Sequence, residues 1–240
     1  MFRYDPRNST LLNLAPRAVP PISVNDAPVA SNGTATTNED TDYTGTLSAS
    51  DVDGDALTYS VLTSPVNGTI AITSSSSGTY TYSPTANYNG SDSFTFTASD
   101  GTLLDTATVS ITVTAVNDAP VATAQTITGT EDTDATITLA GTDVDAGTTL
   151  SYIISTLPTT GTLYQTSDGT TKGDAISTVP TTVTSSTFQV IFTPVANGNG
   201  SGYGNFGFKV NDGTVDGAEA TVTVDITAIN DAPVIAEIDD

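Results

Sequence analysis

An internal repeat constrains this sequence more than any other feature. The heptapeptide VNDAPVA stands at residues 24–30 and again at 116–122, and INDAPVI follows at 229–235. Between these marks the same motifs recur in the same order: ASDVDGDALTYSV corresponds to GTDVDAGTTLSYII, and FTFTASDGT to FGFKVNDGT. Repetition of this kind is typical of arrays of similar domains. We therefore predict an N-terminal extension at 1–23, domains at 24–115 and 116–228, and a linker with the start of a further repeat at 229–240.

Short runs of alternating apolar and polar residues predict strands within each domain. Single threonines separate Tyr80 from Tyr82 and Phe94 from Phe96, which is the period of a half-buried antiparallel strand. Turn pairs, such as Asn-Gly at 67–68 and Asp-Gly at 100–101, separate these runs. The pattern gives about seven strands per domain, as in an immunoglobulin-like sandwich. We predict an all-β chain of two tandem β-sandwich domains.

The second domain contains an insertion. From Tyr59 to Phe94 the first domain spans 35 residues, whereas the corresponding stretch from Tyr152 to Phe206 spans 54, a difference of 19. The added sequence lies around 158–187 and includes YQTSDGTTKGDAISTVP, which predicts a hairpin that leaves the sandwich. Insertions in surface loops are often tolerated decoration, but they are also where a binding surface is added. Both interpretations stay open.

The charge and inventory of the chain exclude several classes of function. The formal net charge is −22, and residues 24–240 contain only Lys172 and Lys209 against 26 acidic residues, a net of −24. A protein that neutralises a phosphate backbone needs clustered cations, so nucleic acid is not an expected partner. Without Cys and His, the chain has no disulfide, no thiolate or imidazole zinc site and no Ser–His–Asp triad. No stretch of the sequence predicts a transmembrane helix.

The acidic residues do not predict an enzyme. Glycosidases hold two carboxyl groups at a fixed distance across one cleft, whereas here the acids recur at domain junctions and the chain has no Trp. We expect no catalytic activity. An excess of negative charge this large weakens the compact state unless cations gather on it, which points to bound divalent metal.

The order of the motifs resembles a known family. VNDAP, then Glu-Asp, then A-x-D-x-D, then L-T-Y-S is similar to the cadherin repeat, and more closely to the cadherin-like (Ig-like) tandem repeats of bacterial giant adhesins and surface proteins. The likeness covers residues 24–233. It implies cadherin-like sandwich domains, a secreted or cell-surface location in a bacterium, and Ca2+ bound at the domain junctions. One departure is that no L-D-R-E motif precedes the FTFT strand, where NYNGSDS stands at 87–93.

The resemblance also implies which residues bind calcium. In cadherin repeats the linker lends oxygen ligands, the preceding domain gives a glutamate, and the following domain gives the D-x-D loop. Carried over to this sequence, the middle junction takes Glu39, Asn117, Asp118, Asp143, Asp145 and Asp212. The first junction takes Asn25, Asp26, Asp51, Asp53 and Asp100. Glu131, Asn230 and Asp231 make half a site that awaits a third repeat.

Elementary chemistry agrees with a calcium site. Calcium binds six to eight oxygens from carboxylates, carbonyls and amides on adaptable loops, and carboxylates crowded together without a cation are costly. An EF-hand is excluded, because the twelfth residue counted from Asp51 is Leu62, where that loop needs a glutamate. Asp55 has no counterpart in the second domain, so we predict a turn residue there. The alternative for all of these aspartates is a solvated turn.

Three functions follow from these expectations. The first is a calcium-stiffened spacer of a bacterial adhesin stalk or surface filament. The second is a self-assembling filament subunit, in which the extension 1–23 is an assembly arm that adds a strand to a neighbouring copy; otherwise the extension is a flexible leader. The third is an adhesive binding module whose 158–187 insertion grips a carbohydrate or protein. The expected partners are accordingly neighbouring repeats, copies of itself joined head to tail, or a host or surface glycan or protein.

Overall fold

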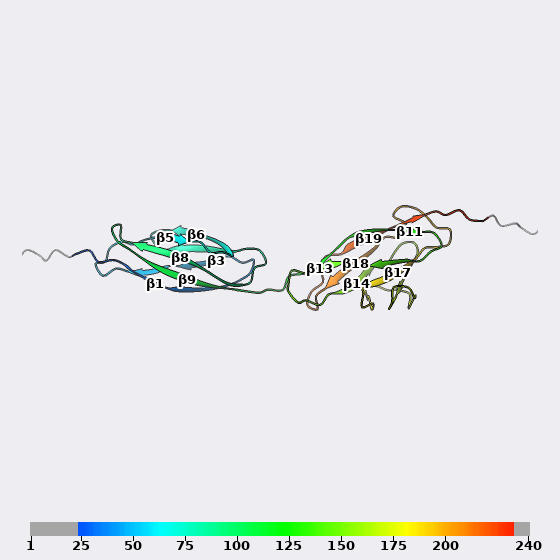
Figure 1. The fold of residues 1–240 in the computed structure, drawn as a ribbon, viewed down its shortest axis with the longest axis horizontal. Helices are drawn as coiled ribbons and strands as arrows, with labels where there is room; N and C mark the ends of the chain where they lie inside the picture. Colours follow the sequence, from blue (N-terminus) through cyan, green and yellow to red (C-terminus); the bar gives the residue numbers. More distant parts are fainter. Residues whose placement is uncertain (1–23, 233–240) are drawn as a thin grey trace, which may run out of the picture. The chain divides into compact units, whose positions relative to one another are not determined.

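A computed structural model describes residues 24–232, which divide into two compact units between Ala115 and Val116 (Figure 1). The ordered elements of the described residues are strands, and none of these residues forms a helix that could cross a membrane. The all-β prediction is therefore confirmed. The predicted extension 1–23 and residues 233–240 lie outside the described residues.

Two sheets pack face to face in unit 1, and a short ribbon extends them. The larger sheet has the order β2-β9-β8-β5, the smaller one β3-β7-β6, and β1 pairs with β4 in the ribbon. The strands are β1 (Val29–Ser31), β2 (Gly33–Asn38), β3 (Tyr43–Thr46), β4 (Ser48–Ser50), β5 (Thr58–Thr63), β6 (Gly68–Ser74), β7 (Thr79–Pro84), β8 (Gly90–Ser99) and β9 (Leu104–Thr114).

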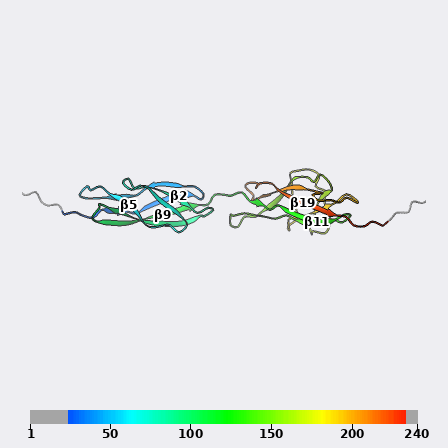
Figure 2. The ribbon, with the colours of Figure 1, turned by 90° about the horizontal axis from the view of Figure 1, so that it is seen from above.

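Unit 2 repeats this arrangement. Its larger sheet has the order β11-β19-β18-β14-β16, its smaller sheet the order β12-β17-β15, and β10 pairs with β13. Figure 2 shows β11 running beside β19, with which it pairs in parallel. The strands are β10 (Val121–Ala122), β11 (Gln125–Thr130), β12 (Ala135–Thr138), β13 (Gly141–Thr142), β14 (Ser151–Thr156), β15 (Thr162–Gln165), β16 (Thr181–Thr182), β17 (Gln189–Thr193), β18 (Phe206–Asn211) and β19 (Ala220–Thr227).

The first strand of each sandwich is interrupted where it changes partner. In unit 1, β1 pairs with β4 and β2 pairs with β9, and Asn32 stands between them. The Oδ1 atom of Asn32 accepts a hydrogen bond of 2.8 Å from the backbone N–H of Thr108, which replaces a backbone bond at the switch. Counting β1 with β2 and β3 with β4, unit 1 has the seven strands that were predicted.

Alternation along the strands builds both cores. Tyr80 and Tyr82 of β7 and Phe94 and Phe96 of β8 are buried while the threonines between them are not, as the period of two requires. In unit 2 the corresponding positions of β17 and β18 are apolar and buried as well. Each unit therefore has its own hydrophobic core.

The insertion of unit 2 folds back on β15. The backbone N–H of Gln165 donates to the carbonyl of Asp174 at 2.9 Å, and the N–H of Ile176 donates to that of Leu163 at 2.8 Å. Residues 166–173 form the loop of this hairpin, and β16 then adds an eighth strand at the edge of the larger sheet.

Candidate metal centre

In unit 1 the D-x-D loop begins where β4 ends. The first residue after the strand, Asp51, accepts a hydrogen bond of 2.9 Å at Oδ1 from the backbone N–H of Asp53. This is an Asx turn, which the short Asp side chain favours. The Oδ2 atom of Asp53 accepts a further bond of 2.8 Å from the backbone N–H of Asp26. The linker before unit 1 is thereby tied to the loop.

Unit 2 has the same arrangement. Asp143 follows β13 directly and accepts a 2.8 Å hydrogen bond at Oδ1 from the N–H of Asp145. Asp145 accepts a 2.8 Å bond at Oδ2 from the N–H of Asp118. Because two separate sequences form the same pair of contacts, the loop is a property of the repeat.

A third aspartate closes each site from the turn between the last two strands. In unit 1, Asp100 accepts at Oδ1 from the N–H groups of Leu103 and Thr102, and at Oδ2 from the amide of Asn25 at 2.9 Å. Hydrogen bonds from these groups, with that of Leu103 the largest influence, hold the pKa of Asp100 below its ordinary value. Asp100 is therefore fixed as an anion beside the linker.

The corresponding aspartate of unit 2 has the same contacts. Asp212 accepts from the N–H groups of Val215 and Thr214 at Oδ1, and from the amide of Asn117 at 2.7 Å at Oδ2. The bond from Val215 is the largest of the influences that lower the pKa of Asp212, and the Asn117 amide comes next. The linker asparagines thus bridge the linker and this turn in both units.

One carboxylate oxygen in each loop is left for another ligand. Among the described residues, no hydrogen-bond donor reaches Oδ2 of Asp51 or Oδ2 of Asp143, although both atoms are buried. A buried carboxylate oxygen without a partner is costly. Its position beside the aspartates of the linker and loop fits a cation that takes oxygen ligands.

The structure adds Asp55 to the site of unit 1. One carboxylate oxygen from each of Asp51, Asp53 and Asp55 lies within 4.8 Å of the others. Each such pair repels by about 1 kcal/mol even at the dielectric constant of water. The prediction that Asp55 serves only the turn therefore missed its carboxylate, because that prediction depended on a counterpart in the second repeat.

The glutamate of each Glu-Asp motif lies where the first long strand ends. Glu39 follows β2, is buried, and donates its backbone N–H to the carbonyl of Thr114 at 3.0 Å. Glu131 follows β11, is equally buried, and donates to Thr227 in the same way. The role of Glu39 as a ligand for the next domain stays a prediction.

Contacts around Glu131 bring it to the last linker. Its Oε1 accepts from the N–H of Ile229 at 2.7 Å and its Oε2 accepts from the amide of Asn199 at 2.8 Å. Next to Ile229, the amide of Asn230 donates to the carbonyl of Asp231 at 3.2 Å, as Asn117 does to Asp118 at 3.0 Å. Glu131 therefore contacts the residue directly before Asn230 and Asp231, and their role as a calcium half-site stays a prediction.

Sequence reasoning did not identify Asn199. It belongs to the ANGNGS segment at 196–201, which matches ANYNGS at 86–91. This shared Asn-x-Asn-Gly pattern is the signal in the sequence that could have identified it. The Asp of each Glu-Asp motif has a structural role: the backbone φ angles of Asp40 and Asp132 are 56° and 58°, and their side chains accept from the N–H groups of Asn87 and Asn197.

Known protein families match both units. A family described as bacterial Ig domain matches residues 25–112, and one described as SibA-like, immunoglobulin-like domain matches residues 105–227. No curated protein matches the chain.

Solved structures with a similar fold include a human protocadherin. Human protocadherin-24 EC1-2 in crystal form II is 14% identical, with a TM-score of 0.55 over 85% of this chain and 100% of that chain. An endo-fucoidan hydrolase from glycoside hydrolase family 107 is 24% identical, with a TM-score of 0.37 over 85% of this chain. This chain spans 29% of that hydrolase. The protocadherin likeness concerns the fold alone.

Proposed function

The chain belongs to the family of SibA-like, immunoglobulin-like domains, and from this premise we propose that it is an extracellular structural module, a spacer that calcium stiffens. The family matches and the cadherin fold confirm the predicted resemblance to cadherin-like and Ig-like tandem repeats of bacterial surface proteins. The observation that carries the calcium role is the buried, unpartnered Oδ2 atom that recurs at Asp51 and Asp143.

Oxygen ligands for one or more calcium ions are available in each unit. In unit 1 they come from Asp51, Asp53, Asp55, Asp100 and the linker residues Asn25 and Asp26. In unit 2 they come from Asp143, Asp145, Asp212 and the linker residues Asn117 and Asp118. When bound, calcium supplies positive charge that offsets the repulsion among these carboxylates.

Stiffening follows from what the linker residues do. Asp26 and Asp118 already donate their N–H groups to the loop aspartates, and Asn25 and Asn117 donate to the turn aspartates. Side chains that hold a common ion with the loop would fix each linker to the domain after it. We retain Glu39 as the predicted ligand from the preceding domain, and Glu131 as the same group at the last linker. A chain of such joints suits a mechanical role in an adhesin stalk or filament, and we assign it no catalysis.

The insertion of unit 2 supports a second candidate, an adhesive module. A hollow of about 280 Å3 lies between the insertion loop and β15, with Gln165, Thr171, Lys172 and Asp174 on its walls. The ammonium of Lys172 lies 5.1 Å from the centre of the Tyr164 ring. Hydroxyl, amide and charged groups beside an aromatic ring suit a carbohydrate. Loss of glycan attachment after Lys172→Ala, with unfolding unchanged, is the result that would favour this function.

Thermal unfolding of the full chain tests the calcium role. Extracellular modules bind calcium with Kd of about 0.1–1 mM, and a site of 0.1 mM adds about 1.4 kcal/mol at 1 mM free ion. A shift of that size raises Tm by several degrees in a domain of this length. We expect the rise with calcium and not with magnesium, relative to excess chelator. Three coincident curves would leave the aspartates as solvated turns and remove the proposal.

A further inference from the structure

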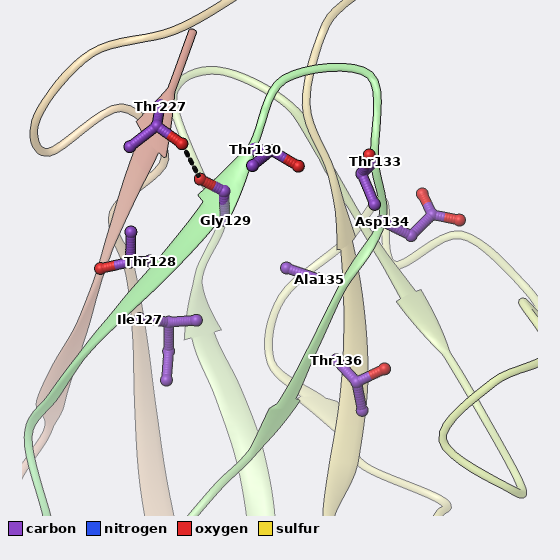
Figure 3. A pocket seen from close by; sticks show the side chains of 9 residues that line it. All are labelled: Ile127, Thr128, Gly129, Thr130, Thr133, Asp134, Ala135, Thr136 and Thr227. Carbon is purple, nitrogen blue, oxygen red and sulfur yellow. Dashed lines mark hydrogen bonds between the residues drawn. The ribbon is translucent and has the colours of Figure 1, made fainter. Parts of the chain in front are cut away.

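A groove opens along one side of unit 2, between β11 and β12. Its volume is about 380 Å3, and Ile127, Gly129, Ala135 and Thr227 are among the residues that line it. Figure 3 shows Ile127 and Ala135 on facing strands with their side chains directed into the gap, and Thr133 in the loop that closes one end. The calcium ligands proposed above do not line it.

The groove lies where unit 2 has a small side chain and unit 1 has an aromatic ring. Ala135 pairs with Phe192 in β17, and at the equivalent register of unit 1 Tyr43 pairs with Tyr82 in β7. The Tyr43 ring packs on the core of unit 1, 6.2 Å from the ring of Tyr80. Only a methyl group occupies this position in unit 2.

Both strands that border the groove have a free edge. Among the described strands, β11 pairs only with β19, at the end of the larger sheet, and β12 pairs only with β17, at the end of the smaller sheet. Exposed edges of this kind accept a further strand, whose backbone pairs with the edge and whose alternate side chains fill pockets. The groove therefore lies between two strand edges that no other described strand covers, and one side-chain bond crosses it, from Nε2 of Gln125 to the carbonyl of Thr138 at 3.0 Å.

We propose that this groove binds residues 8–15 of a second copy of the chain as an added strand. The segment NSTLLNLA is free of proline, although prolines stand on either side at positions 6 and 16. It is long enough to pair with the six residues of β11. In an extended strand its Leu12 and Leu14 fall on one face, which would enter the groove, and Leu11 and Asn13 fall on the other.

Charge favours the same partner. Residues 1–23 contain three arginines against one aspartate, a net of +2, whereas residues 116–240 contain 16 acidic residues against two lysines, a net of −14. Opposite charges steer association and raise its rate. A strand that each copy gives from its N-terminal side and receives in unit 2 is a head-to-tail contact, and such contacts propagate into an open filament. Strand addition of this kind does not need the proposed calcium sites, so it should also occur in excess chelator.

Disulfide trapping between full-length copies tests the contact, since the chain has no cysteine of its own. One copy carries Asn13→Cys, activated as a mixed disulfide with thionitrobenzoate. The other carries a free thiol on the outward face of β11, from Thr126→Cys, Thr128→Cys or Thr130→Cys in turn. The matched controls are Thr34→Cys, Thr36→Cys and Asn38→Cys at the same positions of β2, where Tyr43 fills the sandwich.

We expect at least one thiol on β11 to give about ten times the linked product of its β2 control, a ratio worth about 1.4 kcal/mol. Ala135→Leu, added to the β11 copy, should remove that excess by filling the groove while leaving Tm unchanged. Equal yields on β2 and β11, or an excess that survives Ala135→Leu, would overturn the proposal. A closed monomer from an Asn13→Cys/Thr128→Cys double variant, instead of linked multimers, would contradict a second copy as donor.

Discussion

The backbone N–H of Asp118 donates a 2.8 Å hydrogen bond to Oδ2 of Asp145, and the equivalent bond from Asp26 to Asp53 in unit 1 has the same length. Half of the oxygens of the D-x-D loop are thus used to position the linker and the loop. The Oδ2 atoms of Asp51 and Asp143 remain without a donor among the described residues. A cation bound at these atoms would therefore join the loop aspartates that already hold the linker.

Asp143→Asn should lower stability in calcium but not in chelator. In chelator the substitution removes a charge from a crowded set of carboxylates, so unfolding should move to higher temperature or stay unchanged. In calcium the substitution removes a ligand, and most of the stabilisation of about 1.4 kcal/mol per site should be lost. Calorimetric scans under both conditions measure the two effects.

Asp174→Asn provides the matched control for charge, because Asp174 is exposed and lies in the insertion. It should shift both curves equally. If Asp143→Asn behaves like this control, Asp143 is not a ligand.

Asp55→Asn should weaken calcium binding in unit 1 alone. Its carboxylate lies with those of Asp51 and Asp53, and the charge count of the ligands sets calcium affinity. We expect a loss of about tenfold in one class of sites, equivalent to about 1.4 kcal/mol, with the unit 2 sites unchanged. Isothermal titration resolves the classes. A uniform change in both classes would show that Asp55 acts only through the net charge of the chain.

The fold was predictable from the sequence because the repeat aligned two independent copies of each strand pattern. The period-two alternation predicted the buried aromatic pairs of β7 and β8. The alignment of the two repeats also identified the D-x-D residues. The break at Asn32 could not be predicted, since its side-chain bond to Thr108 crosses 76 residues. Asp55 was missed for the opposite reason, because one repeat has it and the other does not. The groove could not be predicted either. The equivalence of Ala135 and Tyr43 becomes visible only when the register between β12 and β17 is known.

Asp105→Asn should reduce stability at neutral pH and not in acid. The N–H of Ala30 donates to Asp105 at 2.8 Å, and this bond, followed by that of Thr106, holds the pKa of the carboxyl below its ordinary value. A lowered pKa in the folded state adds stability above the pKa of the unfolded chain, about 3.9, which is lost as the pH falls through the folded value. The gap between wild type and variant should therefore shrink below about pH 4.

Unfolding by urea between pH 7 and pH 3 in chelator measures that gap. Protonation of the other carboxylates changes both proteins alike, so the difference isolates Asp105. If the difference in free energy of unfolding stays constant over this range, the destabilisation by Asp105→Asn comes from packing and not from the charge of Asp105.

Gly45→Ala should destabilise unit 1, and the loss should depend on two aromatic rings. A Cβ atom at Gly45 would lie 2.6 Å from the Tyr80 ring and 2.8 Å from the Tyr43 ring, and overpacking of this kind costs about 1–3 kcal/mol. In unit 2 the equivalent position is Ile137, which is fully buried. Its neighbours there are Ala135 and Val190 in place of the two tyrosines. The small residue with two large rings in unit 1 is therefore replaced in unit 2 by a large residue with two small neighbours.

In a Tyr43→Ala/Tyr80→Val background, Gly45→Ala should leave the free energy of unfolding unchanged or raise it. The wild type, the Gly45→Ala variant, the Tyr43→Ala/Tyr80→Val variant and the triple variant form a cycle that measures the coupling between Gly45 and the rings. Thr44→Ala, on the exposed face of β3, is the control and should change the free energy of unfolding by less than about 0.5 kcal/mol. An equal loss of unfolding free energy in both backgrounds would show that the backbone of β3, and not the two rings, disfavours a side chain at Gly45. The difference in rings would then not explain the groove of unit 2.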